Sequence, residues 1–158
     1  YDLDGTPGAQ KSVENPYGDP TVNEHALSFN GGNDSYVNIG SDSALHPNQI
    51  TITSWVRVHG NDAGNNHAGF VSRVGDAIGG EYGYLLGMTF EGEVDDLPYD
   101  NYISFSIEDN LGSHHHHFSD FGIEFNNWYH LSATYDGEMM RLYINGQEQG
   151  VLSNLPIF

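Results

Sequence analysis

Glu93 and Asp95 lie in the segment GEVDDLPYD, residues 92–100, and their types and spacing could do chemistry. Being two positions apart, they would point to the same face of a β-strand. Paired carboxylates on one face are what a retaining glycoside hydrolase uses as nucleophile and acid/base. Pro98 follows directly after Leu97, and proline is excluded from central strands. We therefore interpret the segment as a connection between two strands and assign it no catalytic residue.

The same segment is a candidate calcium loop because carboxylates crowd it: Glu91, Glu93, Asp95, Asp96 and Asp100. Ca²⁺ is coordinated by several carboxylate and carbonyl oxygens. Glu93, Asp95 and Asp96 are the candidate ligands. The alternative is a solvated acidic turn without an ion, since the spacing matches no known calcium-loop motif.

A second candidate calcium site lies in GGNDSYV, residues 31–37. Consecutive glycines allow a tight turn whose carbonyl groups point toward a common centre, and a carboxylate can be added nearby. Gly32 and Asp34 are the candidate ligands. The alternative is an ordinary hairpin turn with Asn33 and Asp34 at positive φ.

Four consecutive histidines, His114 to His117, could bind Zn²⁺ or Cu²⁺ together with Asp120. On an extended chain their directions alternate, so at most two face the same way. Structural zinc sites normally have ligands that are spaced along the sequence and held on rigid elements. Four consecutive histidines do not fit this pattern, so we expect the run to form a mobile loop. Protonation of that loop near pH ~6 would offset part of the negative charge and make binding or assembly pH-sensitive. A flat binding curve between about pH 5 and pH 8 would contradict this hypothesis.

The composition excludes several classes of function. The 158 residues suit one domain, and four Lys+Arg stand against 22 Asp+Glu, for a formal net charge of -18. Such a charge argues against a nucleic-acid partner or an anionic membrane. It favours cation binding or solubility in salty surroundings, and the alternative is a solvated acidic surface without a bound partner. The absence of cysteine excludes disulfides and thiolate chemistry. No apolar run is long enough for membrane insertion, and the opening YDLDGTPG is typical of a processed chain or an excised fragment.

Alternating apolar residues predict the elements that must position these side chains. Short strands are expected at residues 25–30, 35–40, 50–58, 70–74, 82–90, 102–109, 128–135, 138–144 and 147–152. Asp136-Gly137 and Asn145-Gly146 predict type I′ hairpin turns, so the last three strands form an antiparallel meander. We expect an all-β sandwich over residues 25–158, preceded by an irregular arm with one short strand over residues 1–24.

The order of these segments resembles a known family. ALSFNGGNDSYVNIG, ITITSWVRV, GYLLGM and NNWYHLSATYDGEMMRLYINGQEQG resemble the laminin-G-like, concanavalin A-like lectin-glucanase domains, with the bacterial, pentraxin-related branch as the nearest match. The resemblance implies a two-sheet antiparallel jelly-roll sandwich, often with structural Ca²⁺, that binds glycans or other extracellular ligands. Such domains continue past the Asn145-Gly146 hairpin, so this sandwich is expected to lack a closing strand or to borrow one through self-association at an open edge.

The resemblance also bears on the acidic segment. Glycoside hydrolases of family 16 share the fold and carry Glu-x-Asp-x-Glu on one strand. Glu93 and Asp95 match the first two positions, but Leu97 stands at the third and cannot transfer a proton. We therefore expect no enzyme activity.

Aromatic side chains are the expected ligand contacts. Tyr82, Tyr84, Tyr99 and Tyr102 are taken as exposed loop residues that contact the ligand. Trp55 and Trp128 could stack on sugars, but tryptophan in this fold is more typical of core packing.

Three functions follow from the sequence. The first is a secreted or cell-surface, calcium-supported, carbohydrate-binding module. The second is a structural subunit or adhesin domain of an extracellular assembly, completed by strand exchange. The third is a glycoside hydrolase or polysaccharide lyase on the same fold.

Overall fold

The computed structural model describes residues 9–12, 26–29, 36–40, 42–45, 47–60, 67–73, 83–89, 101–108 and 113–150. Two compact units make up the chain: Tyr1–Ser41 with Asp62–Gly64, and Asp42–Asn61 with Asn65–Phe158. The predicted boundary between an arm and a domain at residue 24 stays a prediction. Within the described ranges, no helix has the length and apolar character needed to cross a membrane.

The first unit contains a small antiparallel ladder. β1 (Ala9–Ser12) pairs with β2 (Ala26–Phe29), which confirms a strand in ALSF and a short strand in the N-terminal arm. The strand predicted over residues 35–40 is wrong for the described part, Tyr36 to Gly40. Asn38 Oδ1 accepts the Gly40 N–H at 2.8 Å, and Gly40 has φ 89°, so a local side-chain turn replaces the ladder.

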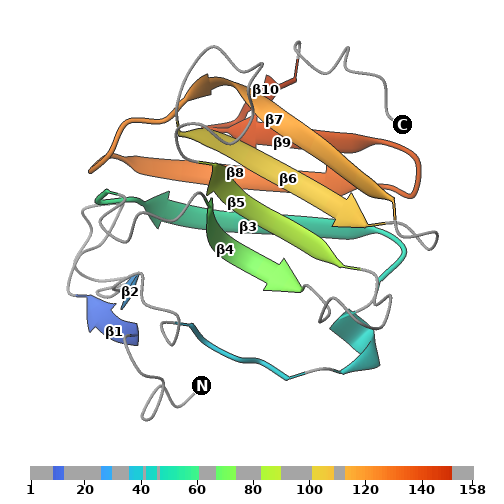
Figure 1. Ribbon diagram of the computed structural model, residues 1–158, viewed down its shortest axis with the longest axis horizontal. Helices are drawn as coiled ribbons and strands as arrows, with labels where there is room; N and C mark the ends of the chain where they lie inside the picture. The colour runs from blue at the N-terminus through green and yellow to red at the C-terminus, as the bar shows by residue number, and fades with distance from the viewer. Residues whose placement is uncertain are drawn as a thin grey trace. The chain divides into compact units, whose positions relative to one another are not determined.

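The second unit contains two antiparallel four-stranded sheets (Figure 1). The β3 sheet has the order β10 (Gln147–Gln149), β9 (Met140–Ile144), β8 (Trp128–Tyr135) and β3 (Ile50–Arg57). The β6 sheet has the order β4 (His67–Arg73), β5 (Tyr84–Thr89), β6 (Tyr102–Glu108) and β7 (His114–Gly122). A 3-10 turn, η1 (Ser43–Leu45), precedes β3. The predicted all-β, two-sheet jelly-roll sandwich is confirmed.

One hydrophobic core lies between the two sheets because each strand turns alternate residues inward. Its buried members are Ile52, Val56, Leu86, Met88, Ile103, Phe105, Ile123, Leu131, Ala133, Leu142 and Ile144. These are the apolar faces that the alternation predicts for β3, β5, β6 and β8. Both sheets are therefore packed against the same core.

The two hairpin turns of the C-terminal meander differ. Asn145 and Gly146, with φ 52° and 80°, form a two-residue loop between Ile144 and Gln147, as predicted. The predicted two-residue turn at Asp136-Gly137 is wrong, because Tyr135 pairs with Met140 across a four-residue loop. Asp136 Oδ1 accepts the N–H groups of Glu138 at 3.0 Å and Met139 at 2.8 Å, which stabilises the longer loop.

The predicted mobile loop of histidines is also wrong, since His114 to His117 begin strand β7. Pairing with β6 supplies the backbone hydrogen bonds, with His115 opposite Ile107 and His117 opposite Phe105. These two histidines therefore lie on the core-facing side of β7. Their neighbours His114 and His116 lie on the other side.

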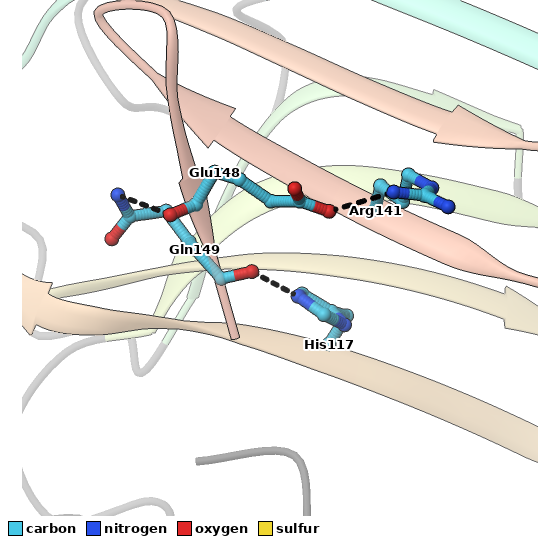
Figure 2. Close-up of polar contacts among 4 residues, drawn as sticks. All are labelled: His117, Arg141, Glu148 and Gln149. Atoms are coloured by element: carbon cyan, nitrogen blue, oxygen red, sulfur yellow. Dashed lines mark hydrogen bonds and ion pairs between the residues drawn. The ribbon is translucent and has the colours of Figure 1, made fainter. Parts of the chain in front are cut away.

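Polar contacts join the edge of the β6 sheet to the edge of the β3 sheet. His117 Nε2–H donates to the Gln149 carbonyl at 2.9 Å, as Figure 2 shows. The Gly150 N–H donates to Asp120 Oδ1 at 3.1 Å, and the Asp120 N–H donates to Gln149 Oε1 at 3.3 Å. Gly150 has φ 118°, and a Cβ there would collide with the His117 ring, so this junction requires glycine.

Candidate functional site

The outer face of the β3 sheet carries a row of four large side chains. The β3–β8 register sets Trp55 opposite His130 and Arg57 opposite Trp128. Residues directly opposite each other in an antiparallel pair project to the same face. Because Val56 and Leu131 point into the core, this four-residue row points away from it. All four side chains are half-buried, so each keeps part of its surface accessible to a ligand.

Ring contacts hold the row together. The Trp55 and His130 ring centroids are 5.3 Å apart with their planes at 58°. Arg57 Cζ lies 5.3 Å from the centroid of the Trp128 ring, which is a cation–π contact. The row therefore has two aromatic platforms, each packed against a polar partner.

His59 and Asn126 position Arg57 from the end of the strand. Arg57 Nη2 donates to His59 Nε2 at 3.5 Å, so His59 Nδ1 must carry the proton that it donates to Asn126 Oδ1 at 3.0 Å. Asn126 has φ 66°, and its N–H donates to the Val58 carbonyl at 2.7 Å. This chain of contacts fixes both the tautomer of His59 and the direction of the guanidinium.

The Asn145 turn positions His130 in the same way. Asn145 Oδ1 accepts the His130 N–H at 2.9 Å, and the Asn145 N–H donates to the His130 carbonyl at 2.8 Å. The side chain of a turn residue thus extends the β8–β9 ladder by one pair. His130 is held on the rigid part of β8 for this reason.

A second cation shares this face. Arg141, on β9, pairs with Glu148 on β10 at 3.0 Å (Figure 2). Hydrogen bonding to Tyr143 and the negative charge of Glu148 raise the pKa of Arg141 above its ordinary value. Two of the chain's four Lys+Arg residues, Arg57 and Arg141, therefore lie on the outer face of one sheet.

The outer face of the β6 sheet is different, because small and polar residues there are buried. Its buried members are Gly87, Thr89, Tyr102, Ser104 and Ser106. A Cβ at Gly87 would lie 2.6 Å from the Ala68 carbonyl oxygen, so β4 and β5 approach too closely for any larger residue. Strands β5 and β6 are therefore packed on both faces.

Two of the tyrosines predicted as ligand contacts lie on strands and not on loops. Tyr84 begins β5 and packs against the core, and Tyr102 begins β6 with 1% of its surface exposed. The premise of exposed loop side chains is wrong for both, although their role in ligand binding stays a prediction. Tyr82 and Tyr99 lie outside the described residues.

The predicted calcium ligands also lie outside the described residues: Gly32, Asp34, Glu93, Asp95 and Asp96. Within the ranges that the structure describes, no group of three or more histidine, aspartate or glutamate side chains is arranged to hold a metal ion. Asp120, considered as a partner of the histidine run, is engaged by the Gly150 N–H at the sheet junction. Calcium binding stays a prediction.

Two residues of the row on the β3 sheet, Trp55 and Trp128, were expected to pack in the core. Core packing is wrong for Trp55 and Trp128, since neither belongs to the buried core. The alternation did put Trp55 and Arg57 opposite the apolar face of β3. The strand pairing that brings them beside His130 and Trp128 has no signal in the sequence, because these residues are more than 70 positions apart.

Family comparison agrees with this architecture. The sequence matches a laminin-G-type family model described as the concanavalin A-like lectin/glucanases superfamily over residues 30–157. The chain therefore belongs to this superfamily. Its placement in the pentraxin-related branch stays a prediction. No curated protein and no solved structure shows significant similarity to the chain.

Proposed function

We propose that this chain is a non-catalytic, extracellular carbohydrate-binding module that binds its ligand on the outer face of the β3 sheet. The observation that carries the proposal is the half-buried row of Trp55, His130, Arg57 and Trp128, which keeps part of its surface accessible. Membership of a superfamily that joins lectins and glucanases supports carbohydrate as the ligand class.

The chemistry of the row suits a sugar. A pyranose presents C–H groups on its faces and hydroxyl groups around its rim, so it needs an aromatic platform beside polar groups. Trp55 and Trp128 offer aromatic surface, and the Arg57 guanidinium offers a planar fork of donors. Thr53 and Ser132, the next outward pair along β3 and β8, add hydroxyl groups to the same face.

The absence of catalysis is part of the proposal. Hydrolysis with retention requires two carboxylates close together, and the four-residue row contains none. Leu97 in place of a third carboxylate in the acidic segment supports the same conclusion. A screen for reducing ends released from polysaccharides tests this point, and any turnover would contradict it.

The test of binding is a glycan array followed by calorimetry on the best ligand. Trp55→Ala should lower the affinity for that ligand by about 30-fold, which corresponds to the loss of an interface hot spot of about 2 kcal/mol. Thr51→Ala is the matched control, because Thr51 is exposed on the same face but lies at the other end of β3. Its affinity should equal that of the native protein. Equal affinities in all three proteins would contradict the assignment of the face.

Calcium support is tested in the same assay. Removing Ca²⁺ with EDTA should lower the melting temperature and abolish glycan binding, and added Ca²⁺ should restore both. A bound ion stabilises the folded state by about 2.7 kcal/mol at 100 times its Kd. Binding and melting temperature that are unchanged by EDTA would remove calcium from the proposal and leave the aromatic row in place.

A further inference from the structure

The outward face of β7 carries a row of rings that the proposed glycan site does not use. His114, His116 and Phe118 alternate along the strand and so lie on the same face. The His114 and His116 centroids are 6.2 Å apart with planes at 21°, and Phe118 stacks on His116 at 6.0 Å and 15°. Both imidazoles are exposed. Two imidazoles are thus presented side by side to solvent on a rigid element.

We propose that His114 and His116 form a two-histidine site for a divalent transition-metal ion, with Cu²⁺ bound most tightly. Imidazole nitrogen suits Cu²⁺, Ni²⁺ and Zn²⁺, and Cu²⁺ has the highest affinity among the divalent first-row metals. Water or an external ligand fills the remaining coordination positions.

Sharing one ion sets a limit on the distance between the two coordinating nitrogens. Metal–imidazole bonds are about 2.0–2.1 Å long, so two nitrogens on one ion lie at most about 4 Å apart. The ring centroids are 6.2 Å apart in nearly parallel planes, so the proposal requires the His114 ring to rotate toward His116, which Ser106 holds.

Ser106 orients one of the two rings for this role. His116 Nδ1 and Ser106 Oγ are 2.8 Å apart, and Ser106 lies directly opposite His116 on β6. When Nδ1–H donates to this hydroxyl, Nε2 keeps the lone pair that a metal requires. Metal-binding histidines characteristically donate their second ring nitrogen to such a fixed acceptor, which sets tautomer and direction.

The fold restricts the site to two of the four consecutive histidines. His115 and His117 are turned to the core-facing side of β7, and His117 Nε2–H is committed to the Gln149 carbonyl. A flexible run of four histidines would offer all its imidazoles equally. On β7, only every second imidazole is presented on the outward face.

Charge favours a cation at this position. Glu108 lies opposite His114 on β6, so its side chain projects to the same face. The whole chain has a formal net charge of -18, which attracts cations over the surrounding surface. In the arrangement that the structure shows, the described residues contain no group of three potential ligands around one ion, so Glu108 enters the proposal as a nearby negative charge.

The test is a Cu²⁺ titration of the folded protein, followed by calorimetry and electron paramagnetic resonance. The native protein should bind one tight Cu²⁺ whose spectrum shows two imidazole nitrogens. Ser106→Ala should weaken this binding about 10-fold, as the loss of an orienting partner does. His114→Gln and His116→Gln should each weaken it further and leave one imidazole nitrogen in the spectrum.

His115→Gln is the matched control, since it removes a neighbouring imidazole from the opposite face of the same strand. It should bind Cu²⁺ with native affinity and a native spectrum, with circular dichroism showing that every variant is folded. Equal losses in His115→Gln and His114→Gln would overturn the proposal, because the run would then act as a flexible tag. Native affinity in a His114→Gln/His116→Gln double variant would overturn it as well. These outcomes are independent of glycan binding.

Discussion

The two sheets share one core but differ on their other faces. The middle strands of the β6 sheet have buried residues on both sides. Gly87, Thr89, Ser104 and Ser106 on their outer face are small, and Tyr102 is a large ring that is buried there. The β3 sheet buries one face only. Its outer face carries Trp55, His130, Arg57 and Trp128, all half-buried and partly accessible to solvent.

The difference separates stability from binding. A strand that is packed on both faces has no surface to offer a ligand, and its polar groups must find partners within the protein. Ser106 meets His116, and the Thr89 hydroxyl donates to the Tyr102 carbonyl at 3.4 Å. A sheet face that is accessible to solvent can instead carry large rings, whose apolar area remains available for a partner. Changes in the β6 sheet should therefore affect folding, and changes in the aromatic row should affect binding.

The largest expected effect comes from a core residue of the β6 sheet. Phe105→Ala should lower the free energy of unfolding by about 3–5 kcal/mol, because Phe105 is fully buried and its removal leaves a cavity. Trp55→Ala removes a comparably large ring from the solvent-accessible face of the β3 sheet. It should lower the free energy of unfolding clearly less than Phe105→Ala does. Urea denaturation measures both. Similar losses would break the distinction between the two sheets.

Gly87→Ala tests how closely β4 and β5 approach. Its Cβ would meet the Ala68 carbonyl oxygen at 2.6 Å, so the strands must separate, and we expect a loss of about 1–3 kcal/mol. Gly69→Ala is the control, because Gly69 is the ladder partner of Gly87. A Cβ at Gly69 would lie 3.3 Å from Leu85 Cδ1, the end of a flexible side chain. A smaller loss in the control is expected by urea denaturation.

Ser119→Ala tests hydrogen bonding within the buried sheet. Ser119 Oγ accepts the Ile103 N–H at 3.0 Å and donates to the Phe121 carbonyl at 2.7 Å. Leaving a buried N–H without a partner should cost about 1–3 kcal/mol. Ser132→Ala, on the outer face of the β3 sheet, should change stability by about 0.5 kcal/mol or less. Thermal and urea unfolding measure both variants, and equal losses of stability in Ser119→Ala and Ser132→Ala would contradict the comparison.

The smallest effect concerns pH. Partial desolvation, with the positive charge of His114, His115 and His67, lowers the pKa of His116 below its ordinary value of 6.5. Below pH 6.5 the unfolded chain therefore binds this proton before the folded chain does, and stability falls as pH falls. His116→Gln should reduce the loss of melting temperature between pH 7.5 and pH 5.5, measured with a chelator present. An unchanged pH dependence would show that His116 does not contribute.

Much of the fold could be predicted from alternation alone. Ile52 and Val56 on β3, and Leu131 and Ala133 on β8, are buried as their spacing requires. The Asn145-Gly146 hairpin followed from the residues that tolerate positive φ. Asp136-Gly137 did not follow the same rule, because the Asp136 carboxylate accepts two backbone N–H groups and stabilises a longer loop. Local chemistry competes with a turn rule when both can satisfy the backbone.

The residues of the two proposed sites were harder to predict, because the residues that each site brings together lie on different strands. The sequence by itself determined the superfamily, the two-sheet architecture, the acidic charge and the fact that at most two of four consecutive histidines share a face. Only the tertiary structure decided that His114 and His116 are the outward pair, and that Trp55 meets His130 while Arg57 meets Trp128. Alternation specifies which residues share one strand's face, but the pairing of distant strands depends on how both sheets bury a common core.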